Sequence, residues 1–329
     1  MLEMSKTKII VGIIVLSLIF IMFQLPWPVE TERDHPVIEQ IDSLNRDGEI
    51  IFLSDTQEPI WIETFLLDEN KNLIAREQIF NETIKERPTK VIHLGDIVAL
   101  GYYDDDWKPI DNYLEKLIEE KIEFYPTLGN HELMLFSEMG EERFMDRFPF
   151  YSKTGYSIKN GTTEIILLNS NFSTMTSREI ADQQEWYINK LVQLEQDSTI
   201  TAVVVGCHHS PFTNSKIVDP DEKVEELFVP PFVEFQKCKL FISGHCHAFE
   251  HFKYREKDFL VLGGGGGLQQ PLYIGTEAKW KDQYDSENPI RMFHFIKYSI
   301  ENDTIKLTLN ILDEDFSHFN NDYKINIAL

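Results

Sequence analysis

Short, mainly apolar runs alternate with helical patterns along most of this sequence. Each run is followed by Gly, Pro or Ser, as buried β-strands commonly are. The runs span residues 50–53, 91–94, 122–125, 200–205 and 240–242. Apolar residues at helical spacing between them predict helices over 73–84, 110–120 and 183–194. The alternation favours an α/β fold.

Two antiparallel pairs are predicted as well. Residues 156–158 and 165–168 flank Asn160-Gly161, which is a strong hairpin signal. Residues 292–300 and 304–311 are separated by a short polar turn. The prediction is a four-layer α/β/β/α sandwich, with two mixed sheets and flanking helices, over residues 47–329.

The N-terminal residues show a membrane pattern. Residues 9–23 carry no charge, Lys6 and Lys8 precede them, and Trp27 follows. A helix from 9 to 27 would span roughly 28 Å, close to the hydrocarbon core of a bilayer. Residues 1–28 are therefore predicted to be a single transmembrane anchor, with a cleaved signal peptide as the alternative. A polar tether follows over 29–46.

The flanking charges predict an orientation. Because lysines precede the apolar segment, the positive-inside rule places the N-terminus in the cytoplasm and the rest of the chain outside it. We therefore expect a single-pass membrane protein with a periplasmic or cell-surface domain.

Composition narrows the class of protein. The chain has 31 Lys and Arg against 55 Asp and Glu, a net charge of −24. This balance disfavours nucleic acid as a partner, because phosphate backbones are bound by clustered basic residues. Three cysteines are too few and odd in number for a disulfide framework.

Metal-ligand residue types follow all five predicted strands. The carboxyl ends of strands in open α/β sheets meet at one edge, where ligands bind. Residues distant in sequence can therefore share one pocket. The motifs are Asp55-Thr56-Gln57, Gly95-Asp96, Gly129-Asn130-His131-Glu132, His208-His209-Ser210-Pro211 and Gly244-His245-Cys246-His247.

Together these motifs resemble the calcineurin-like metallophosphoesterase superfamily, and in particular bacterial members similar to purple acid phosphatases. Other landmarks agree with the resemblance, which covers roughly residues 48–270. They are Gly101, Trp107, Tyr125-Pro126, 183–186 and the glycine run 263–267.

The resemblance implies a centre of two divalent or transition metal ions, Mn, Zn or Fe. Asp96 would bridge the ions, and a bridging hydroxide would attack phosphorus. His131 would protonate the leaving group as general acid. The implied metal ligands are Asp55, Gln57, Asp96, Asn130, His209, His245 and His247.

His209 is chosen over His208 because it stands two residues before Pro211, as the family's ligand does. His208 is then expected just behind the ligands, as is His251, which stands where such enzymes often have Arg. Two further departures matter. Gln57 replaces the usual His, which predicts a weaker first metal site. Ala99 replaces the Tyr of true purple acid phosphatases, so an Fe(III)-phenolate centre is not expected.

The expected function is a membrane-anchored phosphoesterase acting on small phosphate esters, with monoesters favoured over diesters. The alternatives are a phosphodiesterase of the same superfamily and a non-catalytic surface binding protein with a degenerate metal site. An endonuclease is disfavoured by the acidic surface. Metal stoichiometry would separate the enzyme from the binding protein.

Overall fold

The computed structural model describes residues 26–27, 35–39, 47–59 and 71–329. The predicted anchor and most of the tether lie outside these residues. Among the described residues, no helix combines the length and apolarity needed to cross a bilayer.

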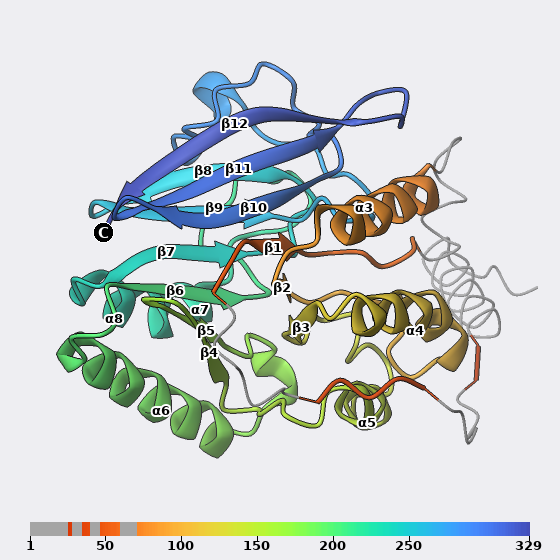
Figure 1. The fold of residues 1–329 in the computed structure, drawn as a ribbon, viewed down its shortest axis with the longest axis horizontal. Coiled ribbons are helices and arrows are strands. Elements are labelled where there is room, and N and C mark those ends of the chain that lie inside the picture. The colour runs from red at the N-terminus through yellow and green to blue at the C-terminus, as the bar shows by residue number, and fades with distance from the viewer. Residues whose placement is uncertain (1–25, 28–34, 40–46, 60–70) are drawn as a thin grey trace, which may run out of the picture.

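Two six-stranded mixed sheets form the centre of the fold (Figure 1). Sheet A has the order β12-β11-β10-β1-β2-β3, and sheet B the order β4-β5-β6-β7-β9-β8. Strands β1, β2 and β3 are parallel, as are β5, β6, β7 and β9. The prediction of two mixed sheets is confirmed.

The strands of sheet A are β1 (Ile50–Leu53), β2 (Lys90–His93), β3 (Glu123–Pro126), β10 (His294–Glu301), β11 (Thr304–Leu312) and β12 (Phe319–Ala328). Those of sheet B are β4 (Tyr156–Asn160), β5 (Thr163–Leu167), β6 (Ala202–Cys207), β7 (Cys238–Ser243), β8 (Phe249–Tyr254) and β9 (Lys257–Leu262). Every residue of β1, β2, β3 and β6 is buried, which is why most positions in these strands are apolar.

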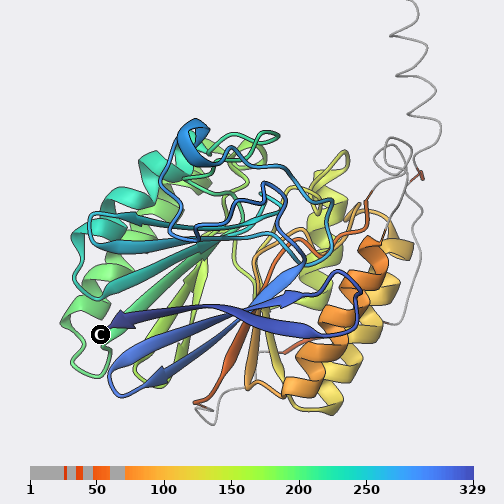
Figure 2. The same cartoon turned by 90° about the horizontal axis from the view of Figure 1, so that it is seen from above.

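Helices cover each sheet. The first group is α3 (Asn72–Glu86), α4 (Asp104–Glu119) and α5 (Ser137–Arg147). The second is α6 (Ser177–Gln196), α7 (Glu222–Leu227) and α8 (Val229–Glu234). Short 3₁₀ turns occur at Phe172–Thr174 and Gly275–Glu277. Figures 1 and 2 show the first group beside β1, β2 and β3, and the second beside sheet B.

Two hydrophobic clusters correspond to these layers. One joins α3 and α4 to sheet A and to the sheet B side chains that face sheet A. The other joins α6, α7 and α8 to the opposite face of sheet B. The sandwich therefore buries both faces of each parallel region and leaves the strand ends for the site.

The hairpin from β8 to β9 was not predicted. Its two turn residues, Arg255 and Glu256, both adopt left-handed backbone, with φ of 46° and 62°. Such a turn usually contains Asn or Gly. Because Arg-Glu carries no turn signal, the sequence pattern did not reveal it.

Candidate metal centre

The predicted ligand motifs follow the carboxyl ends of β1, β2, β3, β6 and β7. Three of them place a non-glycine residue in left-handed backbone, with φ of 59° at Asp55, 55° at Asp96 and 67° at His245. This conformation costs free energy and is found where function requires a sharp turn. The backbone therefore turns sharply just after each of these three strands.

The first group of candidate ligands surrounds Asp55. Its fully buried carboxylate accepts hydrogen bonds from the His245 backbone N–H at 3.1 and 3.0 Å. The Nε2 atom of His247 lies 3.4 Å from the same carboxylate. The Nδ1 atom of His247 donates to the Leu268 carbonyl at 2.6 Å, which leaves Nε2 to face the site.

Gln57 lies beside His247 and is 2% exposed. With its amide oxygen toward His247 Nε2 at 3.0 Å, its nitrogen donates to the carbonyls of Asp55 at 3.2 Å and Asp96 at 3.0 Å. Gln57 therefore joins the first two strand ends, and its oxygen is the atom available to a cation.

The second group surrounds Asp96. The His131 backbone N–H donates to one carboxylate oxygen at 2.8 Å, and His208 Nε2 lies 3.2 Å from the other. His208 Nε2 is also 3.1 Å from Asn130 Oδ1, while its Nδ1 donates to the Leu94 carbonyl at 2.9 Å. His208 thus contacts two candidate ligands from a fully buried position.

His209 and His245 lie next to His208. Their ring centroids are 4.5 Å apart, and His209 Nδ1 is 2.9 Å from the Ser170 hydroxyl. Two groups of side chains each bring their possible ligand atoms within 4.8 Å of one another. The first group is His208, His209 and His245, and the second is Asp55, Asp96 and His208. The structure therefore brings both histidines of the His-His pair to the site, and His208 belongs to both sets.

His131 stands at the edge of this cluster. Its Nδ1 atom donates to the Ala99 carbonyl at 2.9 Å, and its Nε2 lies 3.9 Å from Asp96. The side chain is 13% exposed, so Nε2 is within reach of a ligand entering from solvent.

Glu132 organises the site from behind. Its buried carboxylate accepts hydrogen bonds from the backbone N–H groups of Asp96, Ile97, Val98 and Gly129, at 2.9, 2.7, 3.1 and 2.7 Å. These bonds fasten the turn after β2 to the turn after β3. The sequence places Glu132 in the third motif but indicates no role for it, and Ser170 carries no signal in the sequence.

Burial and neighbouring charges set the protonation of the cluster. Burial raises the pKa of Asp96, but His208 and His131 outweigh burial and hold it well below its ordinary value. Burial lowers the pKa of His208, and Asp96 more than compensates, raising it to about 9. Burial and His208 together lower the pKa of His245 to about 4, and that of His209 also falls well below its ordinary value. The His209 and His245 rings are thus neutral near pH 7, the form in which an imidazole binds a metal ion.

The glycine run 263–267 packs directly against the ligands. A Cβ atom at Gly267 would lie 2.6 Å from His247 Cε1, and one at Gly265 would lie 2.3 Å from the Ser54 carbonyl oxygen. The Gly267 N–H donates to the Asp55 carbonyl at 2.7 Å. Glycine is required here because the backbone passes too close for any side chain. The glycine run therefore positions the ligands.

His251 is not part of the centre, contrary to our expectation. Its ring Nε2 lies 2.7 Å from the Asp258 carboxylate, and its ring Nδ1 lies 3.0 Å from the Tyr323 hydroxyl. The backbone N–H of His251 donates to the Asp282 carboxylate. His251 lies on β8, and its side chain contacts β9 and β12. β8 and β12 are edge strands of sheets B and A, and in sheet A β12 is separated from β1 and β2 by β10 and β11. Topology therefore separates His251 from the ligands although only four positions separate it from His247.

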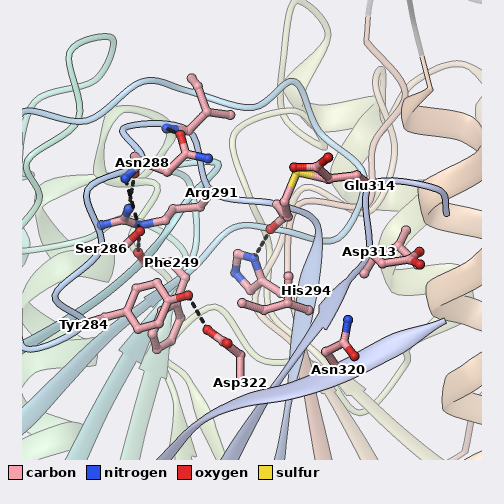
Figure 3. Close-up of a pocket in the computed structure, with 14 residues that line it drawn as sticks. Phe249, Tyr284, Ser286, Asn288, Arg291, His294, Asp313, Glu314, Asn320 and Asp322 are labelled. Atoms are coloured by element: carbon pink, nitrogen blue, oxygen red, sulfur yellow. Dashed lines mark hydrogen bonds between the residues drawn. The ribbon is translucent and has the colours of Figure 1, made fainter.

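A cavity of about 330 Å³ lies behind the glycine run (Figure 3). His294 lines it, and a Cβ at Gly264 would lie 2.2 Å from the His294 ring. The Tyr284 hydroxyl donates to Asp322 at 2.5 Å across the same space. None of the predicted ligands lines this cavity.

A model of the calcineurin-like phosphoesterase family matches residues 48–249. The chain belongs to this family. Members of this family typically bind two divalent metal ions. The resemblance seen in the sequence is confirmed.

Solved structures show the same fold. A purple acid phosphatase from yellow lupin seeds matches with a TM-score of 0.62 and 16% identity, over 85% of this chain and 53% of that chain. The chain thus spans about half the length of the lupin enzyme. GAP50, the anchor in the inner membrane complex of Plasmodium, matches with a TM-score of 0.60 and 12% identity, over 85% and 88%. A dimetal phosphatase from Danio rerio matches with a TM-score of 0.53 and 12% identity, over 85% and 98%.

Proposed function

We propose that the protein is a dinuclear metal-dependent phosphomonoesterase held at a membrane surface by residues 1–28. The observation that carries the proposal is the convergence of two buried carboxylates with three histidines at the strand ends. Asp, Asn and His side chains are a donor set that suits Mn²⁺, Zn²⁺ or Fe²⁺.

The donors divide into two sites that share Asp96. Asp55, Gln57 and His247 would hold the first ion, and Asn130, His209 and His245 the second. His208, bonded to both Asp96 and Asn130, would orient them from behind. The ions, when bound, supply an activated water and neutralise charge on the phosphoryl oxygens.

His131 is the proposed general acid. The Ala99 carbonyl fixes the ring through Nδ1, so in the doubly protonated form Nε2 carries the proton that the leaving alkoxide takes. That Nε2 atom lies 3.9 Å from the Asp96 carboxylate, so the proton would be delivered beside the proposed bridging ligand. The preference for monoesters and the location outside the cytoplasm remain part of the proposal.

The test uses the full-length chain in detergent, loaded with Mn²⁺ or Zn²⁺. We expect turnover of p-nitrophenyl phosphate to exceed that of bis-p-nitrophenyl phosphate, and Asn130→Ala to lower it by at least 100-fold. Asn189→Ala, at an exposed position on α6, is the matched control and should retain full activity. Faster hydrolysis of the diester would overturn the proposed monoesterase activity and indicate a phosphodiesterase. Absence of turnover, with fewer than two ions bound per chain, would favour the binding protein.

A further inference from the structure

Two loops that leave the metal centre meet at its edge, and we call them the rim: residues 99–103, after Asp96, and 131–136, which begin with His131. The Gly101 N–H donates to the His131 carbonyl at 3.1 Å. The His131 ring donates in turn to the Ala99 carbonyl at 2.9 Å. The rim is therefore continuous with the proposed general acid.

The rim exposes apolar side chains. Leu135 is 57% exposed and Phe136 39% exposed, and the Phe136 ring packs edge-on against Tyr102 at 4.8 Å. Leu135 also holds left-handed backbone, with φ of 64°. A leucine in this conformation is strained, and here the strain is not repaid by burial. Such a combination indicates a surface that packs against something outside the chain.

The rim also lies where the apolar N-terminal sequence ends. The Tyr102 hydroxyl donates to the Pro26 carbonyl at 3.0 Å, and Trp27 next to it is 63% exposed. Residues 9–23, which carry no charge, come just before this point. If they cross a bilayer, Pro26 and Trp27 lie at its surface, and the buried Tyr102 lies directly beneath them. Trp is one of the residues enriched at that depth.

The three acidic residues that follow the first rim loop, 104–106, are each bonded within the chain. Asp104 lies 2.6 Å from Arg143, and Asp105 lies 2.7 Å from Lys108. Asp106 accepts a hydrogen bond from the Leu100 N–H at 2.9 Å. Their charge is thus partly neutralised by partners on the same side of the molecule.

We propose that the rim rests on a lipid surface and that the metal centre hydrolyses a phosphate ester carried by a lipid. This inference rests on the proposed function and on the proposed anchor. A soluble anionic ester would have to approach a chain of net charge −24, whereas a lipid ester is delivered by the surface on which the rim lies. The substrate class is therefore a lipid phosphomonoester.

The first experiment tests the orientation without using catalysis. The full-length chain is placed in phosphatidylcholine vesicles, with a bimane label at Leu135→Cys or, as control, at Val192→Cys on α6. Val192 is 40% exposed, and Figure 1 shows α6 on the side of the molecule away from α4. The three native cysteines are buried and will not compete for the label.

We expect a lipid-borne doxyl quencher to reduce the Leu135 signal at least threefold more than the Val192 signal. Equal quenching at the two positions, or a chain that does not associate with the vesicles, overturns the proposal. The proposal is also overturned if the bimane label at position 135 is shielded from lipid while the unlabelled Leu135→Cys chain forms a disulfide-linked dimer under mild oxidation, because the rim would then be a dimer interface.

The second experiment tests the substrate. Phosphate release from phosphatidic acid in the same vesicles is compared with release from glycerol 3-phosphate, its soluble head group. We expect kcat/KM to be at least tenfold higher for the lipid. Equal or faster hydrolysis of glycerol 3-phosphate overturns this inference and leaves the proposed function intact. No hydrolysis of either ester, or of p-nitrophenyl phosphate, overturns both.

Discussion

At the scale of single residues, the His208-His209 pair allows the most direct comparison between the ligand predicted from the sequence and the positions of the two rings in the structure. Spacing before Pro211 favoured His209 as the ligand, and the structure places both rings in the cluster. His208 has both ring nitrogens engaged, by Leu94 on one side and by Asp96 and Asn130 on the other. His209 keeps one ring nitrogen for a cation while Ser170 holds the other.

Replacing His209 and replacing His208 should therefore have different effects on metal binding. We predict that His209→Ala lowers the metal content from two ions per chain to one, because a ligand is lost. His208→Ala should keep two ions with affinity weakened 10- to 100-fold, as is usual when a residue that orients ligands is removed. Metal analysis after gel filtration, with titration of Mn²⁺ by calorimetry, measures both. The reverse order would make His208 the ligand.

At the scale of elements, the site depends on strand ends and on the backbone that packs against them. The glycine run is the clearest case, since Gly265 and Gly267 donate to the carbonyls of Ser54 and Asp55 in the turn after β1. α6 contributes in a similar way through Gln183, whose amide bonds both the N–H and the carbonyl of Asn169 at 2.8 and 2.9 Å. Asn169 directly precedes Ser170, the partner of His209.

We predict that Gly267→Ala weakens binding of the first ion by at least tenfold. Its Cβ would lie 2.6 Å from the His247 ring, which must move away from Asp55. Gly275→Ala is the control, because Gly275 has φ of +58° and no atom within 4 Å of its Cβ position. The control should lose about 1 kcal/mol of stability from backbone strain and bind metal normally. Equal metal binding in both variants would contradict the packing argument.

At the scale of the whole molecule, buried carboxylates make stability depend on pH. Glu250, on β8, is completely buried and accepts hydrogen bonds from the Thr213 hydroxyl and the Asn214 N–H at 2.6 and 2.9 Å. Burial raises its pKa to about 7, although these two bonds oppose the shift. Thr213 and Asn214 lie in the loop that follows His209-Ser210-Pro211, so Glu250 joins sheet B to that loop.

The sign of the effect follows from linkage. Because the pKa is raised in the folded state, the contribution to stability is complete below about pH 4.5, the ordinary value, and is lost as the pH rises to about 7. A shift of this size corresponds to roughly 3–4 kcal/mol. We predict that Glu250→Gln removes this loss and makes the chain more stable than wild type at pH 8.

Urea unfolding at pH 5 and pH 8 in EDTA measures this difference, since EDTA removes the pH dependence of metal binding. Glu185→Gln, at an exposed position on α6, is the matched control and should leave the pH dependence unchanged. A Glu250→Gln chain that loses as much stability between the two pH values as wild type would contradict the assignment.

The sequence alone determined the fold class, the parallel strands and most of the candidate ligands. Fully buried strands leave short, mainly apolar runs, and Gly-Asp, Gly-Asn-His and Gly-His-x-His mark the strand ends directly. These are local signals, carried by adjacent residues. The hairpin at Arg255-Glu256 was missed because its turn residues carry no such signal.

Only the tertiary structure decided how the ligand motifs are held and where the site faces. His251 is four positions from His247 and yet lies at the far edge of sheet B, because strand order is fixed by contacts between distant segments. Glu132, Ser170 and Gln183 each accept a hydrogen bond from a backbone N–H group far from them in the chain. The contact of Tyr102 with Pro26 likewise joins residues 76 positions apart, a distance over which no periodicity in the sequence carries information.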